Sequence, residues 1–66
     1  MELNISSKGL TTLKGVKFSP DVTILNCSFN QLTTLEGCPT NIIKLNCYGN
    51  QLTTLEGCPP SVKIFY

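Results

Sequence analysis

Four cysteines are the residues of this 66-residue chain with the widest range of chemistry. Cysteine forms disulfides, acts as a nucleophile when it is ionised, and binds zinc. The four are Cys27, Cys38, Cys47 and Cys58, separated by ten, eight and ten residues. This spacing contains no Cys-x-x-Cys pair and the chain has no histidine, so the usual structural zinc pattern is missing. We therefore expect no metal and no other cofactor.

Two carboxylates could also do chemistry, because Glu36 and Glu56 occupy the same place in two copies of one repeated segment. Stacked copies would lie about 5 Å apart, a separation that retaining glycosidases use. Repetition alone produces this stacking, however, and Lys14 holds the same place in the preceding segment, where it can pair with Glu36. The chain also lacks histidine, the commonest general base. We expect no catalytic residue and no enzyme activity.

A duplication organises the chain and must position these side chains. Residues 30–39, Asn-Gln-Leu-Thr-Thr-Leu-Glu-Gly-Cys-Pro, recur unchanged at residues 50–59. Leu-Asn-Cys precedes both copies at the same distance, so the unit is about twenty residues long. A fixed period of this length is typical of a solenoid. We expect one domain, residues 1–66, divided into repeats 3–21, 22–41 and 42–61 and a partial repeat 62–66.

Aligning the repeats places the apolar residues in columns that we expect to form the core. The columns are Leu3, Leu25, Leu45, Phe65; Ile5, Cys27, Cys47; Leu10, Leu32, Leu52; Leu13, Leu35, Leu55; Val16, Cys38, Cys58; and Val22, Ile42, Val62. The cysteines stand where the first repeat has Ile5 or Val16, so all four are predicted to fill the core as small hydrophobic residues. A disulfide between stacked partners such as Cys27 and Cys47 stays open, since neighbouring strands lie about 4.8 Å apart, although parallel side chains make its torsion awkward.

Local chemistry favours a short strand in each repeat. Leu-x-Cys and Leu-x-Ile alternate apolar and polar residues, as a half-buried strand does. Glycine at residues 15, 37 and 57 and the prolines that follow break any helix on the return path. The predicted fold is a short parallel β-sheet with extended, polyproline-like or 3₁₀ return segments and little or no α-helix.

Two repeats resemble a known family. Leu25-x-Cys27-x-x-Asn30-x-Leu32-x-x-Leu35 and its copy from Leu45 to Leu55 are similar to the leucine-rich repeat, whose signature is Leu-x-x-Leu-x-Leu-x-x-Asn/Cys-x-Leu. The repeat length and the segment 55–62 resemble the short subclass of bacterial effector proteins, which includes the substrate-binding part of effector ubiquitin ligases, and short arrays in proteins of giant DNA viruses. The resemblance implies a leucine-rich repeat solenoid.

The resemblance also implies roles for single residues. Asn30 and Asn50 match the family's asparagine, a buried amide that bonds the backbone of neighbouring coils, while the first repeat has Lys8 there and serves as a partial cap. In the family the concave strand face binds partners. Carried over to this chain, that face and the positions just beyond it give the predicted partner-binding residues Ile24, Asn26, Phe29, Lys44, Asn46, Tyr48, Ile64 and Tyr66.

Charge and composition narrow the classes of partner. A net charge of +1 with 14% charged residues provides no basic stripe for nucleic acid and no polybasic segment for a membrane. No stretch has the length of a signal peptide or a membrane helix. We expect a soluble, cytoplasmic protein of a cell or infected host.

The end of the sequence suggests how the chain associates. Phe65 and Tyr66 fall inside the fourth predicted strand with no polar capping repeat after them. Such an edge pairs readily, so we expect a homo-oligomer, with a two-fold dimer favoured. The leading prediction is a non-catalytic module for protein interaction or self-assembly, through the strand face or the uncapped end. The alternatives are a substrate-recognising fragment of a larger effector or ubiquitin ligase, and a minimal or engineered solenoid without a natural partner.

Overall fold

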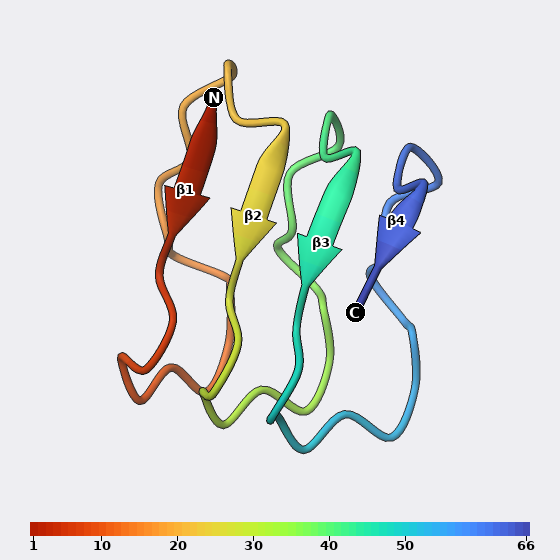
Figure 1. Ribbon diagram of the computed structural model, residues 1–66. Coiled ribbons are helices and arrows are strands. Elements are labelled where there is room, and N and C mark those ends of the chain that lie inside the picture. Colours follow the sequence, from red (N-terminus) through yellow and green to blue (C-terminus); the bar gives the residue numbers. More distant parts are fainter.

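The protein contains one parallel sheet of four short strands and no helix. The computed structural model describes all residues, 1–66. The strands are β1 (Glu2–Asn4), β2 (Ile24–Asn26), β3 (Lys44–Asn46) and β4 (Ile64–Phe65). They lie side by side in sequence order, β1-β2-β3-β4 (Figure 1). The predicted parallel sheet is therefore confirmed.

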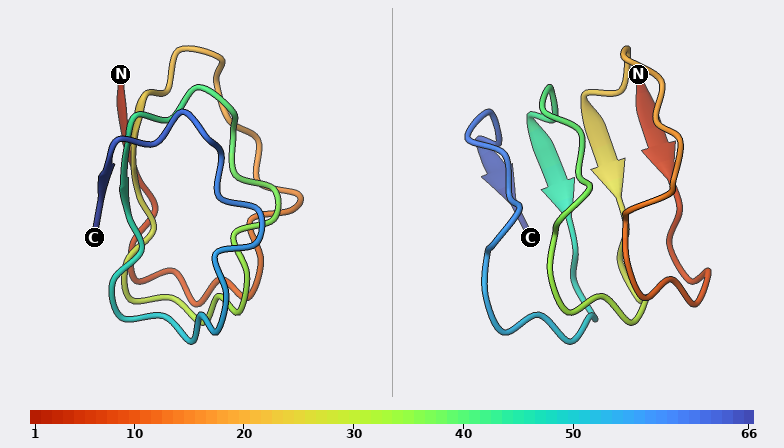
Figure 2. Two further views of the ribbon diagram at one scale, coloured as in Figure 1. Left: turned by 90° about the vertical axis from the view of Figure 1, so that its right-hand side faces the viewer. Right: turned by 180° about the vertical axis from the view of Figure 1, so that it is seen from behind.

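Each strand is followed by a segment that passes behind the sheet and returns to the start of the next strand. One strand together with its return segment is called a coil below. Viewed along the stack, the coils nearly superpose and enclose a single interior (Figure 2). The register pairs Leu3 with Leu25, Leu25 with Leu45 and Leu45 with Phe65, as the sequence columns require.

The strands include Ile24 and Lys44, which directly precede the Leu-x-Cys pattern and were expected on the outward face of the sheet. Cys27 and Cys47, the last residues of that pattern, lie just beyond the strands. Backbone hydrogen bonding nevertheless continues past the strands. The Cys27 N–H donates to the Asn46 carbonyl at 2.8 Å, and the Ile5 N–H donates to the Asn26 carbonyl at 2.8 Å. The coils are thus joined over a longer stretch than the strand bounds indicate.

The core lies between the sheet and the return segments. Its buried members are Leu13, Val22, Leu25, Cys27, Leu32, Leu35, Ile42, Leu45 and Cys47, all from the predicted columns. Cys38 and Cys58 are only half-buried, although both pack against this core. Their prediction as core residues is therefore met in part.

The two sides of the stack differ in how well they are covered. Phe18, from the longer return segment of the first coil, packs against the core, and Leu13 is fully buried. On the β4 side, Leu55 is 61% exposed, whereas Leu35 in the same column is 0% exposed. Phe65 is likewise 42% exposed, although its column partners on β2 and β3 are buried. The predicted apolar columns therefore reach the surface beside β4.

Three glycines have a more specific role than breaking a helix. In each return segment a residue donates its N–H to the carbonyl three residues earlier: Val16 to Leu13, Cys38 to Leu35 and Cys58 to Leu55, at 3.2, 3.1 and 2.9 Å. The third residue of each turn is glycine, with φ of 87°, 95° and 89° at residues 15, 37 and 57. A positive φ at this position defines a type II turn, which glycine adopts without steric cost.

Replacing one of these glycines tests the stacking of the turns. A Cβ on Gly37 would lie 2.6 Å from the Lys14 nitrogen of the preceding coil, whereas a Cβ on Gly15 would meet nothing within 4 Å. Both substitutions impose alanine on a positive φ, but only Gly37→Ala also forces two backbones apart. We expect Gly37→Ala to lower the free energy of unfolding by roughly 1–3 kcal/mol more than Gly15→Ala. Urea unfolding of both variants measures the difference, and equal losses would contradict it.

Candidate functional site

Asn30 joins the first two coils from inside the core, as its predicted structural role requires. Its Oδ1 accepts hydrogen bonds from the N–H groups of Lys8 and Leu10 at 2.9 and 3.0 Å. Its Nδ2 donates to the carbonyls of Ile5 and Cys27, both at 3.0 Å. Asn30 is 6% exposed, so one buried amide satisfies buried and half-buried backbone groups of two coils.

Asn50 repeats this arrangement one coil later. Its Oδ1 accepts from the Leu32 N–H at 3.0 Å, and its Nδ2 donates to the carbonyls of Cys27 and Cys47 at 3.0 and 2.9 Å. Asn50 is half-buried, because less of the chain lies beyond it. The asparagine column is therefore a structural connection between coils, and neither Asn30 nor Asn50 lines the hollow described below.

The four cysteines are free thiols, and burial weakens the nucleophilic character of three of them, Cys27, Cys38 and Cys47. Burial, aided by the neighbouring cysteines, raises the pKa of Cys27 from 9.0 to about 12 and that of Cys38 to about 11. Burial also raises the pKa of Cys47, whose thiol donates to the Tyr66 carbonyl at 3.2 Å. Thiolates are the reactive form of cysteine, so these thiols are poorly suited to nucleophilic catalysis.

The repeated carboxylates lie on exposed turns. Glu36 pairs with Lys14, the residue in the same column of the first coil, at 2.8 Å. The hydrogen bond to Glu36 and the charge of its carboxylate raise the pKa of Lys14. An exposed pair of this kind contributes little to stability. Because the Glu36 carboxylate forms this ion pair, it is not free to act together with Glu56 as a pair of carboxylates.

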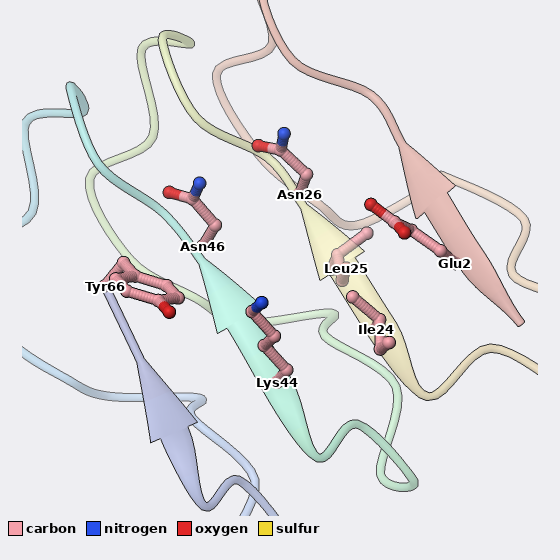
Figure 3. A pocket seen from close by; sticks show the side chains of 7 residues that line it. All are labelled: Glu2, Ile24, Leu25, Asn26, Lys44, Asn46 and Tyr66. Carbon is pink, nitrogen blue, oxygen red and sulfur yellow. The ribbon is translucent and has the colours of Figure 1, made fainter.

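The outward-facing side of the sheet carries most of the predicted partner-binding residues. We call it the strand face; it consists of Glu2, Asn4, Ile24, Asn26, Lys44, Asn46, Ile64 and Tyr66. An open hollow of about 320 Å³ lies on it, lined by Glu2, Ile24, Leu25, Asn26, Lys44, Asn46 and Tyr66 (Figure 3). Five of the eight predicted residues line this hollow; Ile64, Phe29 and Tyr48 do not.

Lys44 lines this hollow between Ile24 and Tyr66 (Figure 3). Its Nζ lies 5.4 Å from the centre of the Tyr66 ring, close enough for a cation–π interaction. Lys44 forms no ion pair within the chain. The hollow therefore offers one cation, the apolar side chain of Ile24 and polar groups from two asparagines to whatever binds there.

The strand-face asparagines also shape the chain, a role that the sequence analysis missed. The Oδ1 of Asn26 accepts from the Ser28 N–H at 3.0 Å and from the Ser28 hydroxyl at 2.6 Å. Asn4 and Asn46 accept from the N–H two residues later in the same way. These bonds form Asx turns, and the signal in the sequence is the asparagine that ends each of the first three strands, since only its oxygen and the N–H two residues later are needed. The Nδ2 groups of Asn26 and Asn46 make no bond within the chain and stay available to a partner.

Phe29 and Tyr48 form a separate aromatic pair beyond the strands. Their ring centres lie 5.7 Å apart at an interplanar angle of 80°, an edge-to-face contact. Phe29 is 60% exposed and Tyr48 is 67% exposed. The Phe29 ring covers Gly49, where a Cβ would meet the ring at 2.6 Å. Ile64, the remaining predicted residue, lies on β4 and is 47% exposed.

Glu2 and Leu25 line the hollow but were not among the predicted binding residues. Glu2 lies opposite Ile24 in the sheet, so the strand register alone could have identified it. Leu25 is 0% exposed and belongs to the core column, so it lies at the base of the hollow and the alternation of the sequence gave no reason to include it.

Removing the Asn30 amide tests the connection between coils. Asn30→Ala leaves backbone groups of two coils without their hydrogen bonds, which costs about 1–3 kcal/mol for a buried group. We expect a loss of roughly 3 kcal/mol in the free energy of unfolding, enough to unfold a marginally stable chain. Asn46→Ala, which removes a single bond at the strand face, serves as the control and should cost less than about 1 kcal/mol. Circular dichroism during urea titration measures both; similar losses would contradict the prediction.

The raised cysteine pKa values predict a loss of stability in alkali. The native state holds the Cys27 and Cys38 protons more tightly than an unfolded chain, in which the pKa stays near 9.0. The free energy of unfolding should therefore be constant below about pH 9 and fall as the pH rises through about 11. Replacing both residues by valine, which the first coil carries at residue 16, should flatten this fall. Urea midpoints at about pH 8 and about pH 10.5 provide the measurement, and equal slopes for the two proteins would contradict it.

No group of three or more potential metal-binding side chains comes together in the structure. The structure contains no helix of the length and hydrophobicity that crossing a membrane requires. Comparison of the chain with protein-family models, curated proteins and solved structures finds no match. The candidate site is therefore defined by its geometry, as a mixed polar and apolar strand face beside an exposed aromatic pair.

Proposed function

We propose that this chain is a leucine-rich repeat solenoid that serves as a non-catalytic module for protein interaction, with the strand face as its binding surface. The twenty-residue repeat, the columns of buried leucine and the coil-joining amides of Asn30 and Asn50 support the solenoid assignment. Repeats of this kind present side chains from successive coils on one continuous surface.

The proposed function rests on one observation: the side chains around the hollow include polar groups that have no partner within the chain. Lys44 and the Nδ2 groups of Asn26 and Asn46 have no hydrogen-bonding or ion-pair partner within the chain. The Tyr66 ring beside them is 56% exposed. Tyr66 lies at the β4 edge of this polar and apolar patch, and tyrosine is among the residues that most often dominate binding energy at protein interfaces.

The chemistry of the remaining residues supports a role without catalysis. The chain has no histidine, and the pKa values of three of its four cysteines are raised. The carboxylates of Glu36 and Glu56 lie on open turns that provide no enclosed substrate site. Four free thiols suit a reducing compartment, so we propose that the module works in the cytoplasm.

A second candidate is self-assembly through the β4 side of the stack. The exposed fractions of Leu55, Phe65 and Ile64 are 61%, 42% and 47%. Covering such side chains is worth roughly 25 cal/mol per Å² of apolar surface. A second copy of the chain, meeting this side with the same residues, would cover them symmetrically.

Site-specific photo-crosslinking tests both candidates. A photoreactive phenylalanine analogue replaces Tyr48 beside the strand face, Leu55 on the β4 side, or Thr33 on the return segment, all of which are exposed. We expect irradiation in cell extract to give a defined crosslinked product from position 48 and none from position 33. A product from position 55 alone would favour the second candidate. No product from positions 48 and 55 would contradict both.

A further inference from the structure

We propose that the occupant of the strand face is a second copy of this chain, bound face to face so that Glu2 of each copy pairs with Lys44 of the other. This inference rests on the proposed function and names the partner that the same surface binds. It differs from assembly at the β4 side, because it uses the outward side chains of β1, β2 and β3.

The charges of the strand face are arranged symmetrically about β2. In the sheet register Glu2 lies opposite Ile24, and Ile24 lies opposite Lys44. Neighbouring strands are about 4.8 Å apart. The backbone positions of Glu2 and Lys44 are therefore about equally far from Ile24, one on each side, and Figure 3 shows the two side chains flanking Ile24.

This row is self-complementary under two-fold symmetry. A two-fold axis that runs along β2 and between two facing sheets keeps the strand direction and reverses the strand order. It brings Glu2 of one copy opposite Lys44 of the other, and Lys44 opposite Glu2, while the two Ile24 side chains meet at the axis. Facing sheets pack about 10 Å apart, a distance that such side chains span together.

Neither charge has an ion-pair partner within its own chain, although the Lys44 ammonium also lies over the Tyr66 ring. The ion pair of this structure joins Lys14 to Glu36 and involves neither group. Glu2 and Lys44 lie two strands apart, roughly 10 Å at the backbone, and β2 separates them. The facing copy supplies each with an opposite charge, and symmetry forms both pairs at once.

The row of asparagines next to these charges on the strand face is compatible with the same two-fold rotation. The register places Asn4, Asn26 and Asn46 opposite one another, so the axis along β2 carries this row onto itself. The free Nδ2 groups of Asn26 and Asn46 then face amides of the other copy. The hollow beside Lys44 supplies room for side chains that cross between the sheets.

Charge reversal tests the pairing. Glu2→Lys and Lys44→Glu each set like charges opposite one another twice in the dimer, so we expect each to weaken dimerisation at least about tenfold. The double variant Glu2→Lys/Lys44→Glu restores opposite charges and should return to within about threefold of the natural chain. Lys63→Glu changes the net charge as Lys44→Glu does but lies outside the strand face, and should leave the affinity unchanged. Sedimentation equilibrium of each purified chain measures the dissociation constants, and circular dichroism checks folding.

Four outcomes would overturn the proposal. The natural chain could sediment as a monomer at about millimolar concentration, which already corresponds to very weak binding. The double variant could fail to recover, or Lys63→Glu could weaken the dimer as much as Lys44→Glu. A monomer that still yields a crosslinked product from position 48 in cell extract would refute the second copy as partner while leaving the proposed function intact. A dimer that only Leu55→Lys disrupts would move the interface to the β4 side.

Discussion

Burial in this protein depends on having another coil stacked alongside. The segments 30–39 and 50–59 have identical sequences, but only the first has a further coil stacked on its β4 side. Leu35 is fully buried, whereas Leu55 in the second segment is largely exposed. A coil cannot enclose its own apolar side chains, because its strand and its return segment are both only one chain thick. Stability therefore resides mainly in contacts between coils, which include the leucine columns, the Asn30 and Asn50 amides and the stacked glycine turns.

Much of this architecture could be predicted from the sequence, because repetition fixes which residues become neighbours. The columns gave the strand register, the buried leucines and the interior position of Cys27 and Cys47. The Leu-x-Cys pattern located the strands but not their ends, since alternation predicts which side a residue faces and not where pairing stops, and Cys27 and Cys47 lie just beyond β2 and β3. The pairing of Lys14 with Glu36 also followed from the columns.

The candidate site could be predicted only in part. Alternation along the strands identified the outward residues, including Ile24 and Lys44. It could not show that Asn26 also holds a turn, that Lys44 lies over the Tyr66 ring, or that Phe29 and Tyr48 pair away from the hollow. These features depend on side-chain rotamers and on local backbone angles, which a repeat pattern does not specify. The inward side chains of the strands, by contrast, repeat from coil to coil because they fill the core. The outward side chains are free to differ at every repeat.

The backbone at Phe29 shows where folding and surface chemistry compete. Its φ of 56° lies in the left-handed region, which large side chains avoid, and the neighbouring coils place Ser7 and Gly49 in the same conformation. A glycine there would fold at lower cost, by roughly 1 kcal/mol. The edge-to-face contact of Phe29 with Tyr48 offsets part of this cost, so the strained turn and the exposed aromatic pair depend on the same residue.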